Sequence, residues 1–189
     1  VEVEAKDPAF ENPTKPVGPV YDKTEAETLA RARGWAIAAD GDKYRRVVPS
    51  PLPKCIPDIG VIRLLVDQGV IVICAGGGGI PVVRRVDGSL IGIEAVIDKD
   101  RAAGLLAQDL SADALLMLTD VDAVYLDWGT TKQQAIRKIS PDVLQRQQFA
   151  AGSMGPKVEA AYAFAETTGG TAAIGALDQA LAILDGRAG

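Results

Sequence analysis

The chain from residue 57 onward alternates between apolar runs of strand length and segments with the apolar spacing of helices. The predicted strands are VIVICA (70–75), ALLML (114–118) and TAAIG (171–175). The predicted helices cover 58–69, 98–110, 140–149, 156–168 and 176–184. Because strands alternate with helices, the pattern predicts an α/β fold with a parallel sheet and helices on both faces.

Residues 1–55 follow a different pattern. The first twenty, with prolines at 8, 13, 16 and 19, are predicted to be extended and loop-like. Asp22 and Glu25 resemble a capping box for a helix over 23–33, which Gly34 ends. Residues 35–39 and 44–48 flank a turn at 40–42 and predict a hairpin. A second hairpin is predicted within 86–97, around Asp87 and Gly88.

These differences suggest three parts. Residues 1–13 form an extended leading segment, and residues 14–55 form a small protruding subdomain between proline-rich hinges. Residues 56–189 form the main α/β domain. We expect the prolines at 49, 51, 53 and 57 to restrict movement between the second part and the third.

Composition narrows the functional classes. Hydrophobic residues make up 48% and charged residues 24%, as in ordinary globular proteins. The net charge of −5 argues against a nucleic-acid partner. There is no histidine, which excludes Ser-His and Cys-His catalysis and a histidine general base. The two cysteines cannot form a disulfide framework, and no segment predicts a membrane span, so we expect a cytoplasmic protein.

Four loops are predicted to lie where ligands bind in open α/β sheets, beyond the carboxyl ends of the strands. They cover 76–81, with four consecutive glycines, 97–100, 119–125 and 152–157. Glycine amides can wrap a phosphate closely, and Lys99 and Lys157 lie at helix starts, where anions collect. Asp120 and Tyr125 are suited to a sugar and a base.

Each loop also has a structural explanation. The glycines fit a tight turn, Asp98 fits a helix cap, and residues 119–122 fit an Asx-rich turn. Lys157 fits a capped helix with a solvated lysine. We expect Cys74 to be a small hydrophobe in a buried strand, and Arg31, Arg33, Arg45 and Arg46 to be a solvated face. Together, however, the four loops favour a site for nucleotide phosphates.

Five segments occur in an order and spacing that resemble one family. They are NPTKPVGP (12–19), AGGGGIPV (75–82), EAVIDKD (94–100), LTDVDAVY (118–125) and AGSMGPKVEAA (151–161). The chain resembles the carbamate kinases of the amino-acid kinase family over essentially its whole length. By this resemblance, the N-terminal third that holds much of the family's carbamate-binding part and dimer interface is absent.

The resemblance implies a three-layer α/β/α sandwich with a mainly parallel sheet, and a lid formed by residues 14–55. It implies reversible phosphoryl transfer between carbamoyl phosphate and ADP, giving ATP and carbamate, in arginine catabolism. It also implies a homodimer and Mg²⁺ held mainly by the nucleotide phosphates, so that no protein metal ligand is expected.

The resemblance also implies residue roles. Lys99 and Lys157 would neutralise the transferring phosphoryl group, and Asp100 would orient them. Lys15 and the run Gly76, Gly77, Gly78 and Gly79 would bind carbamoyl phosphate. The nucleotide would be bound by Asp120, Val121, Tyr125, Met154, Gly155 and Lys157.

Two alternatives remain open at this point. The chain could be a nucleotide-binding fragment without turnover, because the N-terminal loops of the family are absent. It could also be another amino-acid kinase that acts on a different acceptor. The segment 14–55 argues against the latter, because the other branches lack it.

Overall fold

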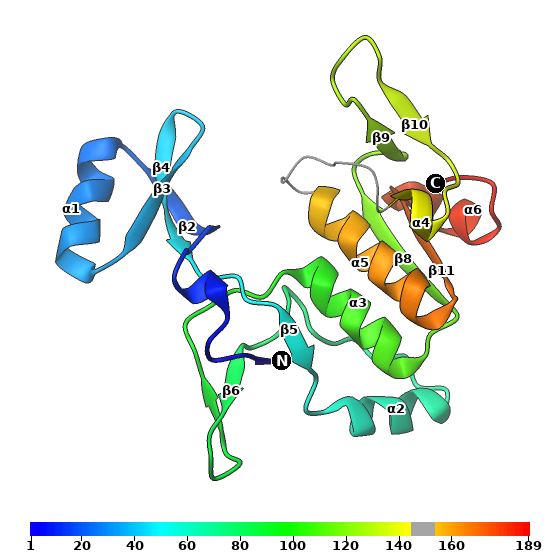
Figure 1. Ribbon diagram of the computed structural model, residues 1–189, viewed down its shortest axis with the longest axis horizontal. Helices are drawn as coiled ribbons and strands as arrows, with labels where there is room; N and C mark the ends of the chain where they lie inside the picture. Colours follow the sequence, from blue (N-terminus) through cyan, green and yellow to red (C-terminus); the bar gives the residue numbers. More distant parts are fainter. Residues whose placement is uncertain (145–153) are drawn as a thin grey trace. The chain divides into compact units, whose positions relative to one another are not determined.

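The computed structural model describes residues 1–144 and 154–189, which form two compact units (Figure 1). Unit 1 consists of residues 1–57 and 73–99. Unit 2 consists of residues 58–72 and 100–189. The chain therefore passes from one unit to the other three times, and each unit is described by itself below.

Unit 1 contains a three-stranded antiparallel sheet in the order β2-β4-β3. Its strands are β2 (Lys15–Tyr21), β3 (Ala36–Asp40) and β4 (Lys43–Val48), and α1 (Lys23–Arg33) lies beside them (Figure 1). The predicted hairpin and helix are confirmed. Gly34 ends α1 in a left-handed conformation, with φ of 67°. Ala26 on α1 is fully buried.

Two details of this region differ from the prediction. Residues 15–21 are not a loop but strand β2, and among the described strands β4 alone pairs with it. An edge strand tolerates Pro16 and Pro19 because one side of its backbone needs no partner strand. Asp22 occupies the N-cap position of α1 but makes no capping hydrogen bond, and its carboxylate pairs with Lys43 instead.

A second sheet of unit 1 has the strand order β5-β1-β6-β7. Its members are β1 (Glu2–Val3), β5 (Pro53–Cys55), β6 (Val82–Arg84) and β7 (Leu90–Gly92), and a 3-10 turn η1 (Pro8–Phe10) follows β1. The predicted turn at Asp87 and Gly88 is confirmed. The first strand of that hairpin, however, lies at 82–84, before the predicted range.

The predicted buried strand over residues 70–75 is wrong. Ile71 and Ile73 are 91% and 96% exposed, and Cys74 is exposed rather than buried. A strand is stable only when a neighbouring strand accepts and donates its backbone hydrogen bonds. Within the described ranges, no strand pairs with residues 70–75.

Unit 2 is built around β8 (Ala114–Thr119) and β11 (Thr171–Ala176), which pair in parallel from Thr171 opposite Ala114 to Ala176 opposite Thr119. A small antiparallel pair, β9 (Val124–Leu126) and β10 (Gln134–Ile136), was not predicted. The helices are α2 (Ile59–Asp67), α3 (Lys99–Leu110), α4 (Pro141–Leu144), α5 (Met154–Thr168) and α6 (Ala180–Leu184), with a 3-10 turn η2 (Leu177–Gln179).

The predicted helices of unit 2 are confirmed with changed bounds. Helix α5 begins two residues before the predicted Pro156, and the predicted helix over 176–184 begins as the turn η2. Helix α4 begins at the predicted Pro141, whereas residues 145–149 of that prediction lie outside the described residues. Within residues 1–144 and 154–189, no helix is long and apolar enough to cross a membrane.

The core of unit 2 lies between the parallel pair and the helices beside it (Figure 1). Phe164 of α5 is fully buried against Leu115 and Met117 of β8 and Ile174 of β11. The α/β class is thus confirmed. The predicted single parallel sheet is not formed by the described residues, because parallel pairing is confined to β8 with β11 and to one position between β1 and β6.

Candidate functional site

The chain connections place the first turns of α3 and α5 at one edge of the parallel pair. Helix α3 leads through a short connection into β8, and α5 leads in the same way into β11. Each helix therefore runs back along the strand that it precedes, and begins near the carboxyl end of that strand. This edge is where open α/β sheets bind ligands.

Lys157 and Asp100 meet at this edge. The Lys157 Nζ donates to both carboxylate oxygens of Asp100, at 2.9 and 2.8 Å. The two side chains are only 8% and 10% exposed. An ammonium at a helix N-terminus is opposed by the helix dipole, and the carboxylate of Asp100 offsets that effect. The pair therefore fixes a buried positive charge at the start of α5.

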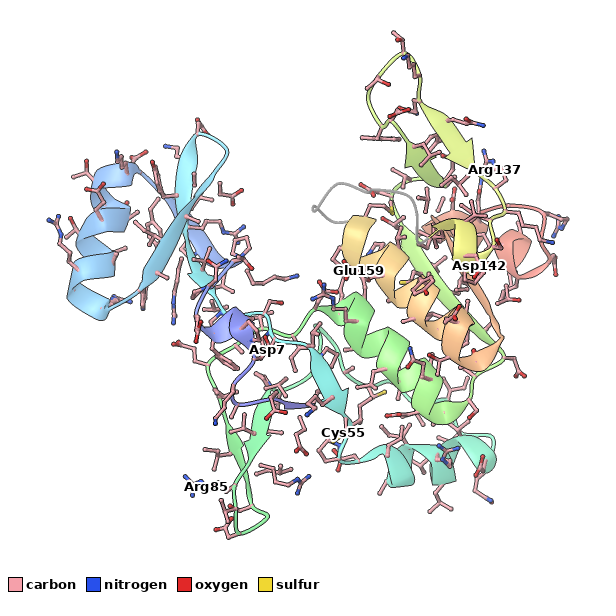
Figure 2. All side chains as sticks on the ribbon, viewed as in Figure 1. Asp7, Cys55, Arg85, Arg137, Asp142 and Glu159 are labelled. Carbon is pink, nitrogen blue, oxygen red and sulfur yellow. The ribbon has the colours of Figure 1, made fainter. Side chains whose placement is uncertain are left out.

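Close packing between α3 and α5 supports this pair. A Cβ atom on Gly104 would lie 3.2 Å from the Cβ of Ala160, so the two helices approach closely. Further along the same contact, Arg101 Nη2 lies 2.6 Å from Glu159 Oε2. Figure 2 labels Glu159 on α5. The small residue and the ion pair together keep the two helix starts in a fixed relation.

The loop after β8 contains the other predicted nucleotide residues of unit 2. Asp120 is exposed and accepts a hydrogen bond from Thr119 Oγ1 at 3.0 Å. Val121 is half-buried, and Ala123 is fully buried and anchors the loop. Met154 packs against the unit 2 core and Gly155 is buried. Gly152 and Ser153, which belong to the predicted fourth loop, lie outside the described residues.

Tyr125 lies in β9, directly after this loop, and is held by a hydrogen bond and a ring contact. Its hydroxyl donates to Asp122 Oδ1 at 2.7 Å, and its ring lies 5.0 Å from that of Trp128. Arg137 of the same unit, labelled in Figure 2, donates to the other Asp122 oxygen at 3.1 Å. Neither Asp122 nor Arg137 was predicted from the sequence to contact Tyr125.

These contacts predict that the carboxyl group of Asp122 has a lower pKa than an ordinary aspartate. The Tyr125 hydrogen bond, and then Arg137, lower the pKa of Asp122 below its usual 3.8. The stability that Asp122 contributes is complete above the usual pKa and is lost as the pH falls through the lower folded value. We expect Tyr125→Phe to raise the pKa of Asp122. NMR of the Asp122 carboxyl carbon as a function of pH measures this pKa. An unchanged titration in that variant would show that the hydrogen bond does not set the pKa.

Unit 1 brings together the predicted residues Lys15, Gly76–Gly79 and the segment before α3. Lys15 Nζ donates to Asp98 Oδ2 at 2.8 Å, and Asp98 is buried. Asp98, which the sequence predicts as a helix cap, accepts this hydrogen bond from a lysine of β2. Lys99, the first residue of α3, is exposed.

The glycine run lies against this segment. A Cβ atom on Gly78 would lie 2.1 Å from the carbonyl oxygen of Ile97, and the φ of Gly78 is 120°. The amide of Gly76 donates to Cys74 O at 2.8 Å, and that of Gly78 to Ala75 O at 2.9 Å. The amide of Gly79 also donates to Ala75 O, so three of the four predicted phosphate-binding amides bond within the loop in this structure. Only glycine fits at position 78.

Comparison with known proteins adds a family match. The model of the amino acid kinase family matches residues 28–175. The carbamate kinase of Haemophilus influenzae is 56% identical over 189 residues, which are 100% of this chain and 61% of that protein. The carbamate kinase of Escherichia coli K12 is 50% identical over 100% of this chain and 62% of its own length.

Solved structures agree with these matches. The carbamate kinase from Giardia lamblia bound to AMP-PNP matches with a TM-score of 0.89 and 42% identity, over 100% of this chain and 61% of that one. The structure of the Giardia lamblia enzyme bound to citric acid matches with a TM-score of 0.89 and 43% identity, over 100% and 60%. The chain thus spans about three-fifths of the relatives that it matches.

Proposed function

The chain belongs to the amino acid kinase family, and from that premise we propose that the protein transfers a phosphoryl group between carbamoyl phosphate and ADP, giving ATP and carbamate. The observation that carries the proposal is the buried Lys157–Asp100 pair at the edge of the parallel strands. The relatives named carbamate kinase, up to 56% identical, support the choice of substrates.

The reaction suits a site without histidine. A terminal oxygen of the ADP β-phosphate attacks the phosphorus, and the bond between phosphorus and the carbamate oxygen breaks. The attacking oxygen is already anionic, and the leaving oxygen takes the electron pair of the broken bond and departs as a carboxylate, so no proton has to be removed or supplied. Such a transfer depends on positioning and on neutralising charge. A lysine that is fixed before the substrate arrives is therefore the main requirement.

Within unit 2, we assign the transferring group and the nucleotide. Lys157 neutralises charge on the phosphoryl group, and Asp100 fixes the position of its ammonium. Lys99, which is the last residue of unit 1 and precedes Asp100 in the chain, is the second proposed lysine. The nucleotide would be bound by Asp120, Val121, Tyr125, Met154 and Gly155, together with Lys157.

Within unit 1, we assign the carbamoyl phosphate side. Lys15 is the proposed cation, and it would exchange its contact with Asp98 for one with the substrate anion. Gly76–Gly79 would bind the same substrate through amides, which requires the loop to release some of its internal hydrogen bonds. Residues 14–55, which contain α1 and the β2-β4-β3 sheet, are proposed as the lid.

Mg²⁺ would enter with the nucleotide and neutralise part of its phosphate charge. Among residues 1–144 and 154–189, no group of three or more acidic, cysteine or histidine side chains is placed to hold a metal ion. By the resemblance to the carbamate kinases, we propose that the nucleotide phosphates hold the ion. For the whole protein we propose the three-layer α/β/α sandwich with a mainly parallel sheet, a homodimer and a cytoplasmic location.

The direct test is ATP formation from ADP and carbamoyl phosphate with Mg²⁺. The assay compares this 189-residue chain with the chain joined to the part of the Haemophilus influenzae relative that it does not match. Activity in both supports the proposal for the chain itself, and activity only in the fusion makes the chain a nucleotide-binding part. Activity in neither, with both proteins folded, would contradict the proposal.

Lys15→Ala should affect the two substrates differently. We expect the KM for carbamoyl phosphate to rise by about 10- to 100-fold, because a charge-assisted hydrogen bond of about 1.5–3 kcal/mol is lost. The KM for ADP should change less than about twofold on the same reasoning. Steady-state kinetics of the active form measure both, with Lys54→Ala, an exposed lysine of unit 1, as the control. Equal increases in both KM values would contradict the assignment.

A further inference from the structure

Three contacts of unit 1 join the β2-β4-β3 sheet, with Pro49 that directly follows β4, to residues 94–98. Arg46 Nη2 pairs with Glu94 Oε1, and Val96 N donates to Pro49 O at 2.9 Å. Lys15 Nζ donates to Asp98 Oδ2 at 2.8 Å. The contacts are made by the side chain of Glu94, the backbone amide of Val96 and the side chain of Asp98. We call these three contacts the 94–98 seam.

Arg46 is the most supported side chain of the seam. Its guanidinium carbon lies 4.8 Å from the ring centroid of Trp35, and that of Arg33 lies at the same distance. Arg46 is 24% exposed, whereas its partner Glu94 is 73% exposed. A planar guanidinium can stack on an aromatic ring and pair with a carboxylate at the same time. The sequence predicts that Arg46 belongs to a solvated face. The structure contradicts this prediction, because Arg46 is stacked on Trp35 and largely covered.

Strand pairing couples Arg46 to Lys15. In the sheet register, Val17 of β2 lies opposite Arg46, and Lys15 lies opposite Val48 of β4. Arg46 and Val48 are two positions apart on β4, so this strand connects the Arg46 contact to the Lys15 contact. A shift of β4 along residues 94–98 would move Lys15 away from Asp98.

We propose that Arg46, stacked on Trp35 and paired with Glu94, is a positioning residue that keeps β2 and β4 in register with residues 94–98 and so holds Lys15 at Asp98. Its consequence for substrate binding rests on the proposed function, in which Lys15 binds carbamoyl phosphate. The contacts themselves do not depend on that function.

The first test measures Lys15 directly. The folded chain is treated briefly with acetic anhydride, and the acetylation rate of Lys15 is followed by mass spectrometry. We expect about a threefold faster reaction in Glu94→Gln and about a fivefold faster one in Arg46→Ala, which also loses the stacking, because exposed ion pairs and cation–π contacts contribute modestly. Arg46→Lys, which keeps the charge, should lie between the wild type and Arg46→Ala.

A matched control is available on the same strand. Arg45 pairs with Asp40 and with the carbonyl of Gly18, both within the β2-β4-β3 sheet, and not with residues 94–98. Arg45→Ala removes the same charge one position away and should leave Lys15 acetylation unchanged. Asp98→Asn removes the Lys15 partner itself and gives the upper limit of the rate. Unchanged acetylation in both Glu94→Gln and Arg46→Ala would overturn the inference.

The second test uses the active form. In Glu94→Gln we expect the KM for carbamoyl phosphate to rise by about threefold while the KM for ADP stays constant, because an exposed pair contributes modestly. If Lys15 acetylation rises but both KM values change alike, a positioning role is overturned. If acetylation rises and not even the wild-type protein forms ATP, the seam is supported and the proposed function fails instead.

Discussion

Replacing Lys157 by alanine is expected to lower kcat for ATP formation about a hundredfold, which corresponds to about 3 kcal/mol of lost transition-state stabilisation. The reason is the position of its ammonium, held by both oxygens of Asp100 at 2.9 and 2.8 Å. A buried charge fixed in advance needs no reorganisation when the phosphoryl group transfers. Steady-state kinetics with saturating ADP and carbamoyl phosphate measure the effect.

The same substitution also removes the Lys157 ammonium from the buried carboxylate of Asp100. Removing one partner of a buried ion pair costs about 3–5 kcal/mol of unfolding free energy. We therefore expect urea unfolding to separate the two effects. The double variant Lys157→Met with Asp100→Leu should regain most of the stability, because a hydrophobic pair avoids the desolvation cost, yet it should not regain activity.

An exposed lysine of the same unit provides the control for charge. Lys132→Ala removes one positive charge from the β9–β10 connection without disturbing a buried pair. Its kcat and its free energy of unfolding should equal those of the wild type within experimental error. A change of less than threefold in the kcat of Lys157→Ala would contradict the role that we assign to Lys157.

Replacing Gly78 by alanine is expected to destabilise the chain by about 2–5 kcal/mol, through backbone strain and overpacking. The added Cβ would lie 2.1 Å from the Ile97 carbonyl oxygen, so either the loop or the segment before Asp98 must move. The φ of 120° is also strained for any residue with a side chain. Urea unfolding measures the loss.

The neighbouring glycine is a matched control. A Cβ on Gly77 would meet no atom within 4 Å, and its φ lies outside the range that favours glycine. Gly77→Ala should change the unfolding free energy by less than about 1 kcal/mol, as at most exposed positions. If the two alanine variants have equal stability, the close approach of Gly78 to Ile97 does not contribute to folding. In that case the loop adjusts without cost.

Short-range signals predicted most of the elements. Helix α1 begins after Asp22 and ends at Gly34 as predicted, and β8 and β11 occupy the predicted apolar runs. Apolar period, capping residues and turn residues act within a few positions of the chain, so a single sequence reveals them. The same signals also placed the turn at Asp87 and Gly88.

The same signals failed where pairing decides the structure. Residues 70–75 have the composition of a buried strand but are largely exposed, because no described strand pairs with them. Residues 15–21, with two prolines, gave a loop-like pattern yet form β2, because β4 supplies the hydrogen bonds. Apolar pattern measures the tendency to be buried, whereas a strand also requires a partner.

For the candidate site, the sequence by itself predicted which residues belong to it: two lysines at helix starts, a glycine run and an aspartate-rich loop. It also excluded histidine chemistry, because the chain contains no histidine. Only the tertiary structure decided their partners. Asp98 holds Lys15 across 83 positions, and Asp100 holds Lys157 across 57. Contacts between residues so far apart depend on how strands pair and helices pack, and no local pattern along the chain encodes that choice.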